Sequence, residues 1–164
     1  MDELQQGLDF CLHDGEAKKY LSLFREQIKK WDMTMPPVTP LVSDFGLGKF
    51  PNIGLIEYWI ANEKAAGYCG KYLFVFDGQT CPMHRHRDKL ETFLIVKGRV
   101  MMDYGGVRHE MAPGDVLLIE RWKYHSFTGV GPALLLEISM PCVVADNYFA
   151  DPAIPLGGNY RKES

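Results

Sequence analysis

The chain has 164 residues and a formal net charge of −3. A domain of about 150 residues buries about 68–70% of its unfolded surface, so this chain needs no metal merely to fold. The acidic balance argues against a nucleic-acid surface, and no apolar run reaches the roughly 18 residues of a membrane span. We therefore expect one soluble domain that contacts neither nucleic acid nor membrane and that suits small neutral ligands.

The cysteines and the N-terminal residues favour a cytoplasmic protein. The N-terminal stretch MDELQQGLDF has neither a basic start nor an apolar signal core. The cysteines are scattered, without a short paired spacing, at Cys11, Cys69, Cys81 and Cys142. We expect them to stay reduced.

Residues 16–31 are predicted to form an amphipathic helix. Glu16 and Glu26 stand among the lysines of its polar face, which favours packing against the domain or a partner subunit over a membrane. The apolar stripe recurs at helical spacing and consists of Ala17, Tyr20, Leu21, Phe24, Ile28 and Trp31.

The segment that follows, MPPVTPLVSDFGLGKFPNIG, is predicted to be an extended connector. Its prolines and glycines interrupt regular structure. Its DFGLGK stretch lacks the spacing of a phosphate-binding loop, in which four residues separate a glycine from Gly-Lys-Ser/Thr. We assign the helix and the connector to residues 1–54.

From Leu55 onward, short strand-like runs follow one another, and turns separate most of them. They are LIEYWIA, KYLFVF, TCPMHRH, ETFLIVK, RVMMDY, VRHEM, VLLIE, HSFTG and ALLLEIS. Gly105 and Gly106 predict a two-residue hairpin. Many short antiparallel strands indicate an all-β sandwich or barrel, and a jelly roll closes its edges most economically. We assign this unit to residues 55–152 and a tail to 153–164.

Four potential metal ligands stand in this region. His84 and His86 project from the same face of a strand, roughly 6.6 Å apart, because successive side chains alternate. The residues RDKL allow a tight turn into the strand that begins at Glu91, so its carboxylate can face the histidines. His125 follows a Pro-Gly-Asp turn and an apolar run, and it offers a fourth ligand.

The alternative to a metal site is a pair of solvent-facing histidines on an edge strand. Arg85 and Arg87 occupy the opposite alternation, which leaves the two histidines on a face of their own. The same alternation is expected to turn Cys81 away from the metal. His13 and His109 fit no such pattern, and we expect ordinary surface or helix-flanking histidines there.

Residues 78–98 resemble the first signature of the cupin superfamily. Gly78, His84, His86, Glu91 and Gly98 stand at its spacing. The second signature is only partly present: Gly114 and His125 fit it, whereas its usual proline, glycine and asparagine are replaced by Glu120, Trp122 and Gly129.

Within the cupins, residues 44–152 resemble the D-lyxose isomerases. The stretches that carry this likeness are DFGLGK, YCGKYLFVFDGQTCPMHRH, DKLETF, and LLEIS together with Asp146, Asn147 and Phe149. The tail LGGNYRKES lacks the acidic ending associated with that family.

The resemblance implies a cupin jelly-roll β-barrel with an N-terminal α-helix, and a homodimer. It implies a metal-dependent isomerase of a free sugar, such as D-lyxose with D-xylulose or D-mannose with D-fructose. A divalent ion, usually Mn²⁺ with Zn²⁺, Fe²⁺, Co²⁺ or Ni²⁺ as alternatives, would be held by His84, His86, Glu91 and His125. The residues that face the sugar would be Lys89, Glu137, Lys71 and Asp146.

These residues suit aldose–ketose interconversion, which moves a hydrogen between C1 and C2 and needs a Lewis acid and a base. Four protein ligands around an ion that prefers six positions leave two for neighbouring sugar oxygens. Glu137 is the candidate base, because burial in the apolar strand ALLLEISM would disfavour its charged form. Lys89 would neutralise negative charge that develops on oxygen.

Two other functions stay open at this point. The same ligand set can bind Fe(II) in a dioxygenase, and a cupin can bind a small ligand without catalysis. Turnover without oxygen separates an isomerase from a dioxygenase, and loss of activity with retained metal on removal of Glu137 separates it from a binding protein. A phosphosugar isomerase is disfavoured by the acidic balance and the missing phosphate-binding loop.

Overall fold

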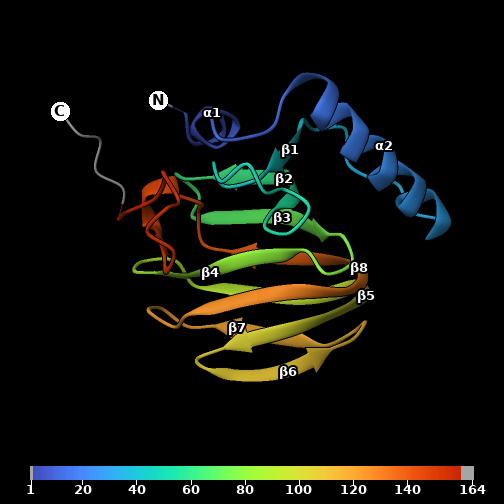
Figure 1. Cartoon of the computed structure of the whole chain (residues 1–164). Coiled ribbons are helices and arrows are strands. Elements are labelled where there is room, and N and C mark those ends of the chain that lie inside the picture. The colour runs from blue at the N-terminus through green and yellow to red at the C-terminus, as the bar shows by residue number, and fades with distance from the viewer. Residues whose placement is uncertain (1, 160–164) are drawn as a thin grey trace.

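The computed structural model describes residues 2–159, in which two helices precede a nine-stranded antiparallel sheet (Figure 1). None of the helices in this part of the chain has both the length and the apolar character that a membrane crossing requires. The elements are α1 (Glu3–Leu8), α2 (Asp14–Lys30), β1 (Pro40–Ser43), β2 (Leu55–Glu63), β3 (Tyr68–Val75), β4 (Thr80–His86), β5 (Glu91–Tyr104), β6 (Val107–Met111), β7 (Val116–Ile119), β8 (His125–Ser139), the 3₁₀ turn η1 (Val144–Asp146) and β9 (Asn147–Phe149).

The sheet curls on itself around the long strand β8. One half of β8 pairs with β3 and the other half pairs with β4, while β5 pairs with β8 along both halves. The remaining neighbours give the order β1-β2-β3-β8-β4-β9, and β6 and β7 join through β5. This arrangement confirms the predicted all-β jelly roll with an N-terminal helix.

Two of the strands are longer than the sequence pattern indicated. ETFLIVK and RVMMDY form the single strand β5, and HSFTG and ALLLEIS form β8. Register shifts interrupt the ladder between Ile95 and Arg99, where Gly98 has φ +72°. A Cβ at Gly98 would overlap the Pro132 carbonyl oxygen, so only glycine allows this irregularity.

The predicted hairpin at Gly105 and Gly106 is confirmed. Both glycines have positive φ, 59° and 84°, and Tyr104 pairs with Val107 across them. A two-residue turn with two positive φ values matches the right-handed twist of the flanking strands.

The connector is more regular than predicted. Pro40–Ser43 forms β1 and pairs with β2, and Pro40 takes the first strand position, where its missing N–H costs least. In DFGLGK, the Asp44 carboxylate accepts hydrogen bonds from the backbone N–H groups of Gly46 at 2.9 Å and Gly48 at 2.8 Å. The stretch is therefore an aspartate-braced turn.

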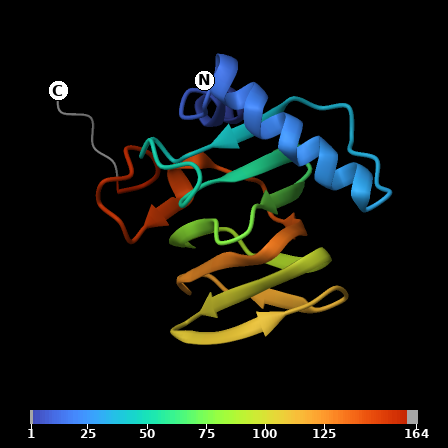
Figure 2. The ribbon, with the colours of Figure 1, turned by 45° about the vertical axis from the view of Figure 1, so that its right-hand side comes forward.

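Helix α2 covers one side of the sheet, as its apolar stripe predicted (Figure 2). Ala17, Phe24 and Ile28 are buried, and Phe24 lies against Tyr58 and Phe74 with ring centroids 5.4 and 4.9 Å away. A second apolar cluster fills the barrel interior, beside the four predicted metal ligands.

Candidate metal centre

The structure brings the four predicted ligands together inside the barrel. Their ligand atoms all lie within 4.8 Å of one another, and the four residues are buried. His84 and His86 come from β4, Glu91 opens β5, and His125 opens β8. His84 and His125 are direct partners in the β4–β8 ladder, so the sheet register itself places two imidazoles side by side.

Backbone carbonyl groups fix the orientation of all three histidines. Each Nδ1 lies within hydrogen-bond distance of a carbonyl oxygen: His84 of Pro82 at 2.8 Å, His86 of Asp146 at 3.0 Å, and His125 of Lys123 at 3.0 Å. A carbonyl oxygen only accepts, so each Nδ1 carries the proton and donates it. In the neutral ring Nε2 then presents a lone pair, as a metal ligand must.

Burial keeps two of these rings neutral. It lowers the pKa of His84 well below its ordinary value, helped by the neighbouring His125 and His86. Burial, followed by the charge of Lys89, also lowers the pKa of His86. At neutral pH both rings therefore keep their Nε2 lone pairs.

These lone pairs face a carboxylate. Glu91 Oε1 lies 3.1 Å from His86 Nε2 and 2.8 Å from His125 Nε2. His125 Nε2 makes no hydrogen bond in this geometry, although it is fully buried. Burial by itself would raise the pKa of Glu91, but the charge of Lys89 and the nearby His86 hold it well below its ordinary value.

A divalent cation fits this donor set. Nitrogen lone pairs and an ionised carboxylate oxygen converge with no proton between them, and a shared cation would satisfy all of them at once. Bonds of about 2 Å to one ion would place ligand atoms within about 4 Å of one another, close to the observed separations. Three imidazoles and one carboxylate suit several transition metals.

Lys89 and Glu137 lie beside this centre and contact each other. Lys89 Nζ is 2.6 Å from Glu91 Oε2 and 3.0 Å from Glu137 Oε1, and the Ser139 hydroxyl donates to Glu137 Oε1 at 2.7 Å. Glu137 is 3% exposed, so it does face inward. Although its strand is apolar, the carboxylate is not alone there, because Lys89 and Ser139 both contact it.

Lys71 is buried in a second set of contacts. Its Nζ lies 3.3 Å from Glu57 Oε2, 3.1 Å from Cys142 Sγ and 4.4 Å from the centre of the Trp59 ring. Trp59 Nε1 also donates to Glu57 Oε2, at 2.8 Å. Burial alone would lower the pKa of Lys71, but Cys142, Glu57 and Glu137 raise it well above its ordinary value, so the amine stays charged.

A cavity of about 50 Å³ adjoins these groups. Its lining brings together residues that are far apart in the chain, namely Phe45, Leu55, Glu57, Lys71, Leu73, Cys81, His84, Lys89, Phe93, Phe127, Glu137, Asn147 and Phe149. The sequence interpretation missed Glu57. Its signal was present, because Glu57 is a carboxylate within an apolar strand, which is the pattern that singled out Glu137.

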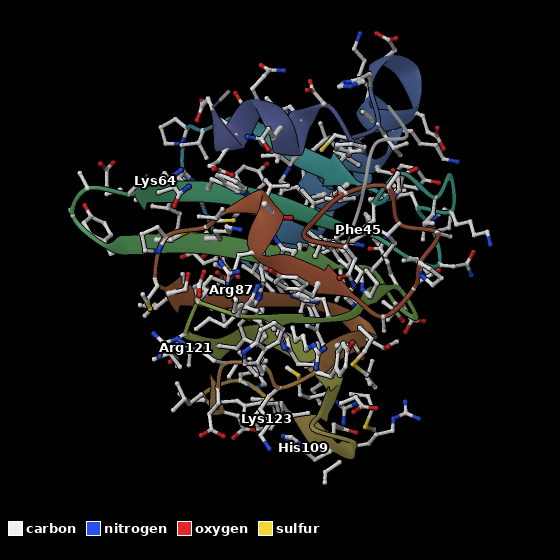
Figure 3. The ribbon with its side chains drawn as sticks, turned by 90° about the vertical axis from the view of Figure 1, so that its left-hand side faces the viewer. Phe45, Lys64, Arg87, His109, Arg121 and Lys123 are labelled. Carbon is white, nitrogen blue, oxygen red and sulfur yellow. The ribbon has the colours of Figure 1, made fainter. Side chains whose placement is uncertain are left out.

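Asp146, which was expected to face the sugar, is not among the residues that line this cavity. Its carboxylate accepts hydrogen bonds from the backbone N–H groups of residues 87–89, and its carbonyl oxygen is the partner of His86 Nδ1. The turn that Asp146 contacts begins at Arg87, which is labelled in Figure 3.

Cys81 lines the same cavity as His84, so the prediction that alternation turns it to the opposite face was wrong. The β4–β8 register shifts between Cys81 and His84, and this irregularity reverses the alternation between them. Cys81 is nevertheless outside the group of four converging ligands. His13 and His109 lie away from the site as expected, before α2 and on the exposed strand β6.

Sequence comparisons agree with this arrangement. The cupin domain family matches residues 74–139, and the D-lyxose isomerase family matches residues 38–103. D-lyxose/D-mannose isomerase of Thermosediminibacter oceani is 30% identical over 174 residues, covering 87% of this chain and 95% of the relative. D-lyxose ketol-isomerase of Cohnella laeviribosi is 31% identical over 143 residues, covering 69% of this chain and 76% of the relative.

A solved structure shares the fold over nearly the whole chain. L-ribose isomerase of Cellulomonas parahominis superposes with a TM-score of 0.72 at 16% identity, covering 92% of this chain and 97% of that chain. The alignment with the Thermosediminibacter oceani enzyme spans almost the full length of both proteins. The chain therefore belongs to the D-lyxose isomerase family of the cupins, a family of aldose–ketose sugar isomerases.

Proposed function

We propose that this protein is a metal-dependent isomerase that interconverts D-lyxose with D-xylulose or D-mannose with D-fructose. D-lyxose and D-mannose have the same configuration from C2 to C4, so one site can orient the reacting end of either sugar. The observation that carries metal dependence is the convergence of buried imidazole lone pairs on the ionised Glu91 carboxylate. The names of the relatives support the sugar class.

The ion would be held by His84, His86, Glu91 and His125. When bound there, a divalent metal supplies a Lewis acid that polarises the carbonyl oxygen and its neighbouring hydroxyl oxygen. We propose Mn²⁺, with Zn²⁺, Fe²⁺, Co²⁺ and Ni²⁺ as alternatives that the nitrogen-rich donor set also suits.

Glu137 is the proposed base. Its carboxylate would take the proton from C2 of the aldose and deliver it to C1, while the proton of the C2 hydroxyl moves to the C1 oxygen, which gives the ketose. One group must therefore reach both carbons. Lys89 and Ser139 hold Oε1 by contacts of 3.0 and 2.7 Å, which leaves Oε2 to meet the sugar. Fixing one oxygen in this way orients the other towards its target.

Lys89 is the proposed stabiliser of negative charge on the reacting oxygens. Burial alone would lower the pKa of Lys89, but Glu137 and Glu91 raise it far above neutrality, so it stays a cation. A fixed cation in a water-poor interior stabilises developing charge more than the same cation in water. Lys71, held by Glu57, is the proposed donor to a sugar hydroxyl farther from the reacting carbons.

Sugar binding must enlarge the cavity. Its volume of about 50 Å³ is well below the roughly 300–1,000 Å³ of ordinary ligand pockets. Phe45 and Phe149 line it and contact each other with ring centroids 5.6 Å apart. We propose that movement of such side chains admits the sugar and that their return excludes water.

Anaerobic NMR spectroscopy of metal-loaded protein with D-lyxose and with D-mannose tests this function. We expect the corresponding ketose to accumulate, and solvent deuterium to enter at C1 or C2 if a proton is exchanged at Glu137. Unchanged spectra with both sugars would refute the substrate assignment. Turnover that needs oxygen would instead favour a dioxygenase.

The homodimer and the cytoplasmic location stay predictions. Sedimentation of the purified protein tests the first, and fractionation of cells that express the full chain tests the second.

A further inference from the structure

The turn between β4 and β5 joins two of the proposed metal ligands, and one buried carboxylate holds it. Asp146 is 7% exposed. Its Oδ1 accepts from the N–H groups of Arg87 at 3.1 Å and Asp88 at 3.2 Å, and its Oδ2 accepts from Asp88 at 3.2 Å and Lys89 at 3.0 Å. Three consecutive amides therefore point at one charged acceptor, which gives stronger hydrogen bonds than a neutral acceptor would.

Asp146 also acts directly on a ligand. Its carbonyl oxygen lies 3.0 Å from His86 Nδ1, and this contact fixes the tautomer that presents Nε2 to Glu91. The next residue, Asn147, opens β9 and pairs with His86. One residue thus fixes the imidazole before the turn and the backbone of Lys89 inside it, while Lys89 contacts Glu91 after it.

The segment that carries Asp146 is tied to the N-terminal helix. Glu3 is the buried residue of α1, and its Oε2 accepts the Val144 N–H at 2.8 Å at the start of η1. Its Oε1 pairs with Lys64 at 2.9 Å. Lys64 and Arg87 are labelled in Figure 3, and they mark the two ends of this set of contacts.

Resting on the proposed function, we infer that Asp146 is a positioning residue of the metal centre and that Glu3 holds η1 so that Asp146 keeps its place. Asp146 does not line the cavity, and its contacts are with His86 Nδ1 and the turn, so by this inference it acts through them. Helix α1 is by this inference part of the metal-binding apparatus, although Glu3 and Val144 are 141 positions apart in the chain.

The variant Asp146→Asn tests the proposed role of Asp146 in positioning the metal centre. An asparagine amide keeps the size of the side chain but turns one acceptor oxygen into a donor that opposes a backbone N–H. We expect the dissociation constant for Mn²⁺, measured by chelator competition, to rise 10–100-fold. We also expect a changed visible absorption spectrum of the Co²⁺-loaded protein and faster hydrogen exchange of the amides of residues 87–89.

Asp77→Asn is the matched control. Asp77 is exposed and accepts a backbone N–H from Gly131 at 2.8 Å, but it does not line the site. We expect its Mn²⁺ affinity and Co²⁺ spectrum to equal those of the wild type within twofold.

Three variants test the proposed role of Glu3 in holding η1, with little risk to the fold. Glu3→Ala removes the acceptor of the Val144 N–H, and we expect it to weaken Mn²⁺ binding severalfold. Glu3→Gln keeps an acceptor oxygen and should restore most of the affinity. Lys64→Met removes only the exposed partner of Glu3 and should leave the affinity unchanged.

The outcomes separate this inference from the proposed function. Wild-type affinity and spectrum in folded Asp146→Asn, or equal affinities of Glu3→Ala and Glu3→Gln, would overturn it. Wild-type protein that bound no divalent metal would refute the proposed metal dependence. Unchanged exchange of residues 87–89 in Asp146→Asn would then overturn the role of Asp146 in the turn independently.

Discussion

The two buried layers of this molecule differ in what they contain. The layer between α2 and the sheet is apolar, with Phe24, Ile56, Phe74 and Leu134 almost fully buried. The barrel interior buries charged groups and groups that could hold a metal ion beside its apolar side chains, namely Lys71, His84, His86, Lys89, Glu91, His125 and Glu137.

This difference suggests that one layer mainly stabilises the fold and that the other mainly serves the chemistry. Burying charged groups costs desolvation energy, and replacing buried ion pairs with packed apolar groups is often neutral or stabilising. The polar side of the barrel is therefore expected to add little to stability for its size. Its presence fits a site for chemistry, while the α2 layer carries stability.

The largest effect on activity is expected from removing the metal ligands. His125→Ala, or treatment of the wild type with a strong chelator, should abolish isomerisation and metal binding. The circular dichroism spectrum should stay that of a folded protein, because the apolar core does not depend on the ion. A chelated protein that unfolds would contradict the separation between the two layers.

Glu137→Gln should lower kcat about 10²–10⁴-fold, because a positioned base contributes about that much. Glutamine keeps the volume but cannot take up the proton, and the four ligands are untouched. Metal content, measured by elemental analysis, should equal that of the wild type. Activity within tenfold of the wild type would remove Glu137 from its proposed role.

Phe24→Ala probes the other layer. Removing this ring, which is 1% exposed, should lower the free energy of unfolding by about 3–5 kcal/mol, as measured with urea. Metal affinity should not change. Leu23→Ala is the neighbouring control: Leu23 is 44% exposed, and its removal should cost less than about 0.5 kcal/mol.

A smaller effect is expected from acid on the metal-free protein. Burial lowers the pKa of His84 and of His86 in the folded state, so below about pH 6.5 the unfolded chain binds more protons than the folded one. The free energy of unfolding is therefore highest above that pH, where these histidines are neutral in both states. It decreases as the pH falls, because the unfolded chain then takes up protons that the folded one does not. Urea unfolding should show this loss between pH 7.5 and 5.5, and a flat profile would contradict it.

The sequence could indicate that His84, His86 and Glu91 lie together because the relevant rules are local, whereas His125 reaches them only through the pairing of β4 with β8. Alternation along one strand places His84 and His86 together, and a short turn returns Glu91. The helix over residues 16–31 and the Gly105–Gly106 hairpin are confirmed for the same reason. Local rules failed at Cys81, where an irregularity in β4 reverses the alternation, and at Pro40–Ser43, which forms a strand only through pairing with β2.

The sequence by itself determined how polar and apolar residues alternate along each strand. That pattern indicated the fold class and the residues that could bind a metal. Only the tertiary structure decided what surrounds them: Lys89 contacts Glu137 and Glu57 contacts Lys71, while Asp146 holds the turn and Glu3 holds η1. Hydrogen-bond and ion-pair partners depend on distances of about 3 Å between segments far apart in the chain. Such distances are set by sheet register and packing, which no local pattern of residues specifies.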